Sequence, residues 1–157
     1  MAGKVVPRGK HMLTRLDSGL TLHTHFRMDG AWRVYRPGQR WAPPAHQVRL
    51  VLENAEAVAV GYRMPVVELV RDESTVVGHL GPDVMDEEAF DADEAVRRLA
   101  AQPDREIGLA LLDQRNLAGI GNLYKVESLF LRGVHPWARV ADVDDLAGLV
   151  EKARTLM

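Results

Sequence analysis

The residues best suited to chemistry lie around a short glycine-rich turn in the last third of the chain. An apolar run from Leu111 ends in Ala-Gly-Ile-Gly at 118–121, and Asn122 begins a second apolar-periodic run. Two glycines flanking one isoleucine let the backbone turn tightly between two helices. They also leave backbone N–H groups bare at the positive end of the second helix, which suits a phosphate. We therefore predict that this segment binds a nucleic-acid backbone.

Asn122 has two uses at this position, and they can coexist. Its side-chain oxygen can accept from helix N–H groups as a cap, or its amide can donate to a phosphate. Gln114 is expected to be structural within the helix pair. Asp113 is expected to make capping or local hydrogen bonds rather than to act as an acid or base.

Composition limits the classes of protein to consider. A chain of 157 residues predicts one domain or two small ones, and a hydrophobic fraction of 46% suffices for a packed core. The absence of cysteine removes disulfides and thiolate metal sites. No apolar run approaches the ~20 residues of a membrane span, and the first residues lack the apolar core of a signal peptide. We expect a cytoplasmic protein without a membrane partner.

The net charge of −2 hides a strong asymmetry along the chain. Residues 1–49 carry nine Lys or Arg against Asp17 and Asp29, a balance of +7, whereas residues 86–106 carry eight acids against three arginines. A polyanion can bind the basic part although the whole chain is slightly acidic. The alternative is that these long basic side chains only solvate one face of a sheet.

The first half of the sequence is typical of strands and the second half of helices. Short alternating runs separated by turn signals predict six strands, at 10–16, 20–26, 31–35, 47–53, 56–62 and 66–70. Apolar periodicity near 3.6 predicts four helices, at 93–100, 106–116, 122–132 and 144–157. The expected class is α+β, with a β-sandwich or partly open barrel over 1–70, a linker over 71–92 and a helical module over 93–157.

Four motifs together resemble one known family. They are Arg8-Gly-Lys-His-Met-Leu13, His23-Thr-His-Phe-Arg-Met-Asp-Gly-Ala-Trp-Arg33, His79-Leu-Gly-Pro-Asp83 and the segment from Leu111 to Pro136. Their order and spacing are similar to those of the formamidopyrimidine-DNA glycosylase and endonuclease VIII family. The Trp after Asp-Gly-Ala, and the lack of Asp-Pro-Arg-Arg-Phe-Gly near 61–67, favour the endonuclease VIII branch. The resemblance implies a partial antiparallel β-sandwich followed by a helix-two-turns-helix DNA-binding module.

The resemblance also implies an activity, base-excision repair. Such enzymes flip an oxidised base of double-stranded DNA, cleave its glycosidic bond and nick the backbone by β- or δ-elimination. The family nucleophile is an N-terminal Pro followed by Glu, whereas this chain begins Met1-Ala2, and the family's Cys₄ zinc finger has no counterpart here. We therefore expect a middle section of such an enzyme, truncated at both ends, without a cofactor, monomeric, and inactive or impaired by itself.

The resemblance assigns roles to six residues. Lys10 is the proton donor for β-elimination, Arg27 and Met28 fill the gap left by the flipped base, and the contacts to the DNA backbone are His25, His79 and Asn122. Plainer alternatives are a solvated Lys10, a hairpin end with Met28 in the core, and an exposed His79 in a linker. His23 and His25 share a strand face but lack an evident third metal ligand, so His23 is expected to be packed or solvated.

Two further hypotheses stay open beside a glycosylase and lyase. One is a non-catalytic module that holds abasic or nicked DNA, and the other is a structural or interaction domain that reuses the fold. Salt dependence separates the DNA-binding hypotheses from the last, because each phosphate contact lowers log K by about 0.9 per unit of log salt concentration. Trp32 and Trp137 are expected in core or interdomain packing, since scattered tryptophans make no stacking platform.

Overall fold

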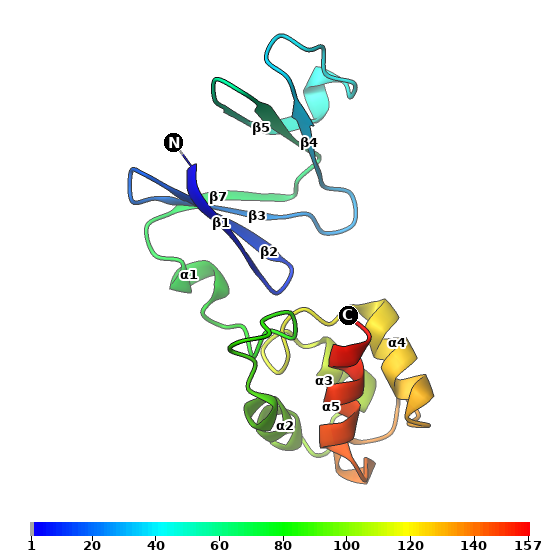
Figure 1. Ribbon diagram of the computed structural model, residues 1–157. Coiled ribbons are helices and arrows are strands. Elements are labelled where there is room, and N and C mark those ends of the chain that lie inside the picture. Colours follow the sequence, from blue (N-terminus) through cyan, green and yellow to red (C-terminus); the bar gives the residue numbers. More distant parts are fainter. Residues whose placement is uncertain (1) are drawn as a thin grey trace. The chain divides into compact units, whose positions relative to one another are not determined.

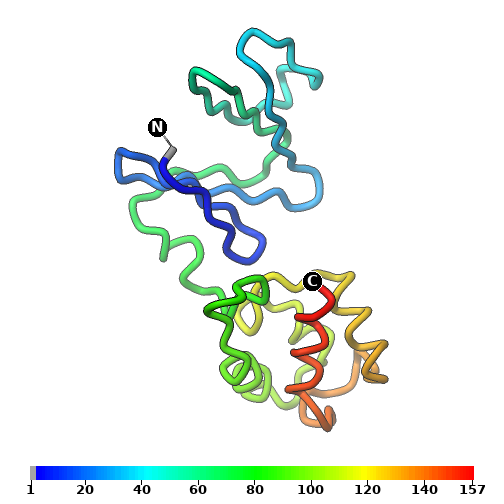
Figure 2. The backbone as a smooth tube through the Cα atoms, in the orientation of Figure 1, coloured from blue at the N-terminus to red at the C-terminus, as the bar shows by residue number. Residues whose placement is uncertain are grey.

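The computed structural model describes residues 2–157, and the chain forms two units. One unit ends at Gly78 and the other begins at His79. Figure 1 shows the helices and strands of each unit, and Figure 2 follows the path of the backbone. Antiparallel strands in the first unit and helices in the second confirm the predicted α+β class. The segment expected to be a linker, 71–92, contains helix α1 (Ser74–Val77) in the first unit and passes into the second at His79.

Within the described residues, the first unit contains two antiparallel sheets. The larger has the strand order β1-β2-β3-β7 and the smaller the order β4-β6-β5. Gly19, at a φ of +79°, closes the turn between β2 and β3, and Asn54 accepts from two backbone N–H groups in the turn between β5 and β6. The strands are β1 (Ala2–Arg8), β2 (His11–Leu16), β3 (Thr21–His25), β4 (Ala31–Tyr35), β5 (Val48–Glu53), β6 (Val58–Tyr62) and β7 (Val66–Val70).

The two faces of the larger sheet differ in what they contact. Since successive side chains of a strand point to opposite faces, β2 places Met12, Thr14 and Leu16 on one face and His11 on the other. The face with Met12 and residues of the smaller sheet, among them Trp32, line a hollow of about 660 Å³ inside this unit. The two sheets are therefore the partial β-sandwich that the sequence predicts.

Two helices of the second unit, over Ala92–Ala100 and Leu146–Thr155, begin where an aspartate side chain accepts from a backbone N–H group of the first turn. Asp91 accepts from the backbone of Glu94 and Asp145 from that of Gly148, at 2.8 and 2.7 Å. Short 3₁₀ turns at Ala45–Gln47 and Val140–Asp142 complete the elements of the two units. The helices are α2 (Ala92–Ala100), α3 (Ile107–Leu112), α4 (Asn122–Leu131) and α5 (Leu146–Thr155).

Helix α3 is shorter than the predicted helix over 106–116. Asp113 leaves the helical conformation, with a ψ of 108°, and its carboxylate accepts from both the backbone and the guanidinium of Arg115. These local bonds compete with the next helical turn.

An apolar core holds the second unit together, with Leu99, Leu111, Ile120 and Leu149 fully buried. It stabilises both the helices and the connection between α3 and α4. No helix in the described part of the chain is long and apolar enough to cross a membrane.

Candidate nucleic-acid interface

In the first unit, Lys10 and His25 lie at the same end of the strands of the larger sheet. Lys10 occupies the tight turn between β1 and β2, which Gly9 allows with a φ of +56°. His25 ends β3 and lies opposite His11, the residue after Lys10. Partial desolvation by neighbouring protein atoms lowers the pKa of Lys10, which makes its ammonium a better proton donor near neutral pH. We call Lys10, His25 and Arg27 the Lys10 corner.

A hydrogen bond determines the tautomer of His25. The backbone N–H of Arg27 donates to Nδ1 of His25 at 3.0 Å, so the proton of the neutral ring is on Nε2. Burial lowers the pKa of His25, and the charges of Arg27, His23 and Lys10 lower it further. His25 therefore presents a neutral imidazole with an Nε2–H donor, which can bind a phosphate oxygen.

The loop after β3 exposes the side chains expected to fill the space of a flipped base. Met28 is 95% exposed, so the alternative that it is part of the core is wrong. Arg27 is also exposed and has a φ of +47°, a strained backbone conformation for a residue other than glycine. The N–H of Gly30 donates to the carbonyl of Phe26 at 2.9 Å and closes the loop. We call residues 26–30 the exposed tip.

His23 is packed rather than solvated. It is 4% exposed, its Nε2 lies 2.7 Å from Nδ1 of His11, and its Nδ1 lies 3.1 Å from Glu68. Residues 2–157 contain no group of three or more His, Asp or Glu side chains arranged to hold a metal ion, and the sequence has no cysteine. These residues do not fit the Cys₄ zinc site of the family.

In the second unit, residues 118–121 form the tight connection between α3 and α4 that the sequence predicts, here called the glycine turn. Gly119 has a φ of +101°, and a Cβ there would lie 2.8 Å from Val84 Cγ2. Gln114 clamps the turn, since its Oε1 accepts from the N–H of Gly119 and its Nε2 donates to the carbonyl of Ile120, both at 3.0 Å. The expected structural role of Gln114 is confirmed.

The segment that begins at His79 runs alongside the glycine turn. The N–H of Gly81 donates to the carbonyl of Gln114 at 2.9 Å, and the N–H of Ala118 donates to the carbonyl of Pro82 at 2.8 Å. Leu80 is buried while His79, the residue before it, is exposed. Two motifs that are 30 to 40 residues apart in the sequence are thus side by side, and His79 belongs to the surface near the turn.

The cap predicted for Asn122 is wrong. Gly121 occupies the N-cap position of α4, without a side-chain hydrogen bond to the first turn, and Asn122 is already helical. Its Oδ1 accepts instead from Nζ of Lys125 at 2.7 Å, one turn further along the helix. The amide Nδ2 of Asn122 and the N–H groups of the first turn are then the donors that a phosphate would meet.

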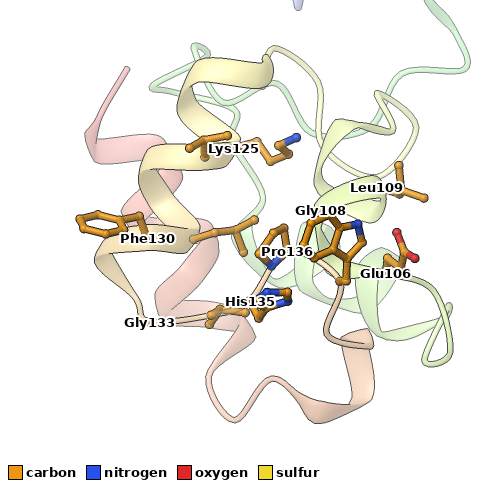
Figure 3. A pocket seen from close by; sticks show the side chains of 12 residues that line it. Glu106, Gly108, Leu109, Lys125, Phe130, Gly133, His135 and Pro136 are labelled. Atoms are coloured by element: carbon orange, nitrogen blue, oxygen red, sulfur yellow. The ribbon is translucent and has the colours of Figure 1, made fainter.

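Trp137 is not a core residue, as it is 69% exposed. It follows Pro136, whose carbonyl accepts from the N–H of Gly108 and holds this loop against α3. Trp137, together with Leu109 and Phe130, lines an apolar hollow of about 610 Å³ (Figure 3). The sequence predicts Trp137 in core or interdomain packing, and it does not predict this hollow.

Two residues near the Lys10 corner are missing from the sequence-based expectations. His11 and Glu68 bracket His23, and only the strand register shows that these three share one face with His25. The sequence showed only one part of this pattern, the spacing of two residues between His23 and His25 in a single strand. The structure places Lys10 and His25 at the same end of their strands, with Arg27 and Met28 in the loop that follows His25. In the second unit, the segment that begins at His79 is hydrogen-bonded to the connection that precedes Asn122.

Comparisons with known proteins match both units of the chain to one family. The family model of the formamidopyrimidine-DNA glycosylase N-terminal domain matches residues 2–64, and that of the formamidopyrimidine-DNA glycosylase H2TH domain matches residues 80–154. The "Probable endonuclease 8 2" of Streptomyces coelicolor is 52% identical over 98% of the chain. The "DNA-(apurinic or apyrimidinic site) lyase Nei2" of Mycolicibacterium smegmatis is 38% identical over the same share.

The fold is that of a solved DNA glycosylase. The formamidopyrimidine-DNA glycosylase of Lactococcus lactis, non-covalently bound to DNA containing an AP site, superposes with a TM-score of 0.82 over 99% of this chain at 23% identity. The chain spans 57% of the Streptomyces relative, 60% of the Mycolicibacterium relative and 60% of the Lactococcus chain. With both domain models matched in order, the chain belongs to the formamidopyrimidine-DNA glycosylase family, next to relatives named endonuclease 8.

Proposed function

We propose that the protein acts in base-excision repair as a DNA glycosylase and AP lyase. It binds damaged or abasic DNA, excises oxidised bases and nicks the backbone by β- or δ-elimination. Support comes from the names of the relatives, endonuclease 8 and apurinic or apyrimidinic lyase, and from the Lactococcus glycosylase bound to AP-site DNA. We further propose that its partner is double-stranded DNA and that it acts as a monomer in the cytoplasm.

The observation that carries the proposal is the composition of the Lys10 corner beside the exposed tip. Lys10 supplies an ammonium whose pKa is lowered by burial, and His25 supplies a neutral Nε2–H donor. Both can contact one phosphate, and Lys10 can give a proton from Nζ to the phosphate oxygen that leaves during elimination. Met28, the residue after Arg27, is exposed and apolar enough to enter the base stack.

The exposed tip can offset part of the free energy that base flipping costs. Extruding a base loses stacking and pairing worth a few kcal/mol, least at a site where the base is damaged or missing. A side chain that fills the gap recovers part of this loss. Met28 has nearly its whole surface available for that contact, and the hydrogen bond from Arg27 to His25 ties its loop to the phosphate-binding residue.

The second unit contributes donors from its backbone. The first turn of α4 follows Gly121, which has no side chain to cap it, so its N–H groups point out of the helix start. Asn122 adds an amide and the exposed His79 adds an imidazole on the neighbouring segment. Such donors fix a duplex in register without reading its sequence.

A binding experiment with this chain tests the proposal. Fluorescence anisotropy compares a duplex that carries a tetrahydrofuran abasic-site analogue with the same duplex intact, over a salt series. We expect tighter binding of the abasic duplex by about tenfold, and we expect Lys10→Gln to reduce the magnitude of the salt slope by about 0.9. The matched control is Lys4→Gln, because Lys4 is an exposed lysine elsewhere on the β1–β2 hairpin. The Lys4→Gln protein should keep the preference for the abasic duplex.

Equal affinity for both duplexes, or affinity that salt does not change, would contradict the proposal. Borohydride reduction on an abasic duplex then addresses the lyase step, because it traps an amine bound to the sugar as a stable adduct. An adduct identifies an amine of this chain as the nucleophile. Binding without an adduct favours the DNA-binding module among the three hypotheses.

A further inference from the structure

A small polar pocket lies on the smaller sheet, beside the exposed tip. Its volume is about 260 Å³, and Arg33, Arg63 and Tyr62 are among the residues that line it. Asp29, which belongs to the exposed tip, lines it as well. Trp32 lines the hollow between the two sheets, so Arg33, the next residue of β4, lies on the opposite face of the smaller sheet. We call this space the arginine pocket.

The backbone of Arg63 has a strained conformation. Its φ is +46°, and among the non-glycine residues that the structure describes only Arg27 of the exposed tip shares a positive φ. The neighbours on either side, Tyr62 and Met64, are both buried. The N–H of Arg63 also donates to the carbonyl of Gln47 at 2.8 Å. Strain that the surroundings hold in this way is concentrated at binding sites, so it favours a binding role for Arg63.

The arginine pocket carries an excess of positive charge. Within residues 2–157, neither Arg33 nor Arg63 forms an ion pair with a carboxylate. Arg33 interacts with the hydroxyl of Tyr35, which leaves its charge in place. Burial raises the pKa of Tyr62 to about 12, so its phenol stays protonated and adds no negative charge. Asp29 is then the one acid in the described lining, against two guanidinium groups.

Two guanidinium groups around a small space are suited to a phosphate. The planar guanidinium can donate to two oxygens of one phosphate at once, and it stays charged at any physiological pH. Hollows that hold drug-sized ligands measure roughly 300–1,000 Å³, and the arginine pocket is smaller than these. Its size and charge therefore match a phosphate group better than a larger ligand.

The exposed tip connects this pocket to the Lys10 corner. At the start of the tip, the N–H of Arg27 donates to His25, and at its end Asp29 lines the arginine pocket. We propose that the arginine pocket binds a backbone phosphate of the damaged duplex next to the gap that Met28 fills. The site rests on the proposed function, because it uses the same duplex. A phosphate bound at each end of the tip positions Met28 at the gap.

The experiment neutralises single phosphates of the abasic duplex as methylphosphonates and measures the affinity by fluorescence anisotropy. The positions lie within about three nucleotides of the abasic site on either strand, since each nucleotide advances about 3.4 Å. At the phosphate that the pocket binds, neutralisation should weaken binding by the wild type about tenfold. Arg63→Gln should weaken binding of the unmodified duplex by about as much, and neutralising the same phosphate should then cost nothing further.

Two more variants make this coupling specific. Arg33→Gln should lose its sensitivity at the same phosphate as Arg63→Gln, whereas Lys10→Gln should lose it at a different one. Arg49→Gln is the matched control, because Arg49 is an exposed arginine of β5 that does not line the pocket. The Arg49→Gln protein should stay as sensitive as the wild type at every position.

Other substitutions separate binding from a structural role. Arg63→Gly removes both the guanidinium and the backbone strain, so the free energy of unfolding should rise while the affinity falls about tenfold. Asp29→Asn removes the acid of the pocket and should tighten binding about threefold. A loss of stability in Arg63→Gly, or weaker binding by Asp29→Asn, would mean that these residues organise the fold and would overturn the site.

Failure of the site and failure of the proposed function are distinguishable. If the abasic duplex binds and no phosphate couples to Arg63, the site is overturned while the proposed function stands. If no duplex binds, the proposed function is overturned, and NMR titration of the free chain with inorganic phosphate decides on the pocket. The Nε–H signals of Arg33 and Arg63 should then shift and that of Arg49 should not. Equal shifts of all three signals, or none, overturn the site.

Discussion

The two units present their candidate DNA contacts in different ways. In the first unit the contacts are side chains at the ends of strands and in the loop after β3, namely Lys10, His25 and Met28, of which Met28 is almost fully exposed. In the second unit they are mainly backbone N–H groups at the start of α4, placed by a buried glycine turn that Gln114 clamps. A site made of side chains can lose a contact without losing the fold, whereas a site made of backbone depends on the core beneath it.

The sharpest way to break this comparison is to disturb the glycine turn. Gly119→Ala adds a Cβ 2.8 Å from the buried Val84 at a φ of +101°, so steric strain and backbone strain combine. We expect the second unit to lose about 3 kcal/mol of unfolding free energy and its Tm to fall by roughly 15 °C. Thermal unfolding followed by the helical circular dichroism signal measures the loss.

Gly133→Ala is the matched control for this variant. Gly133 also has a positive φ, +65°, but no atom lies within 4 Å of the position that a Cβ would take there. It should therefore show only the conformational cost of about 1 kcal/mol. Equal losses at the two glycines would mean that the turn is not held tightly against Val84.

A second comparison uses acid, because each unit contains a carboxylate held by arginine. Hydrogen bonds from Arg115 and then Arg105 lower the pKa of Asp113, and a hydrogen bond from Arg15 lowers the pKa of Glu73 to about 2. Since both pKa values are lower in the folded state, both groups stabilise it at neutral pH, and this contribution is lost as the pH falls below about 4. Asp113 is the better buried, with 8% of its side chain exposed against 25% for Glu73.

We expect Asp113→Asn to cost the second unit about 2 kcal/mol at neutral pH. Glu73→Gln should cost the first unit less than about 1 kcal/mol, because Arg15 is half exposed and water screens the pair. Urea unfolding at pH 7 and near pH 3 measures the unfolding free energy of both variants. The loss of unfolding free energy relative to the wild type should be smaller near pH 3 for each variant. A larger cost at Glu73 would reverse the ranking of the two units.

Local signals predicted most of the fold. Strands β4 and β7 have the predicted bounds, because alternating residues between turn signals depend only on near neighbours. Strand β1, which was not among the predicted strands, contains Gly3 and Pro7, residues that favour turns, and is defined by its pairing with β2. The end of α3 at Leu112 also depends on a contact, the hydrogen bonds of Asp113, that periodicity does not show.

The candidate site was predictable where the chemistry is local and not where it depends on tertiary contacts. Gly119 and Gly121 predicted the tight turn, and the structural role expected for Gln114 was correct. The sequence did not predict the hydrogen bond of Asn122 with Lys125. It also did not predict the contacts of His23 with His11 and Glu68, because those contacts depend on the register of three strands. The roles of Lys10, His25, Arg27, Met28, His79 and Asn122 in DNA binding stay predictions.

The smallest expected effect on stability belongs to the exposed tip. A variant there can change DNA binding without changing the stability of the fold. Met28→Ala removes a side chain that is 95% exposed, so the unfolding free energy should change by less than about 0.5 kcal/mol. Preference for the abasic duplex over the intact one should nevertheless fall about tenfold, because the gap left by the flipped base is no longer filled. Val34→Ala, an exposed apolar residue on β4, is the control and should change neither quantity. If Met28→Ala keeps full lesion preference, Met28 does not fill the gap left by the flipped base, and the role proposed for the exposed tip is contradicted at this residue.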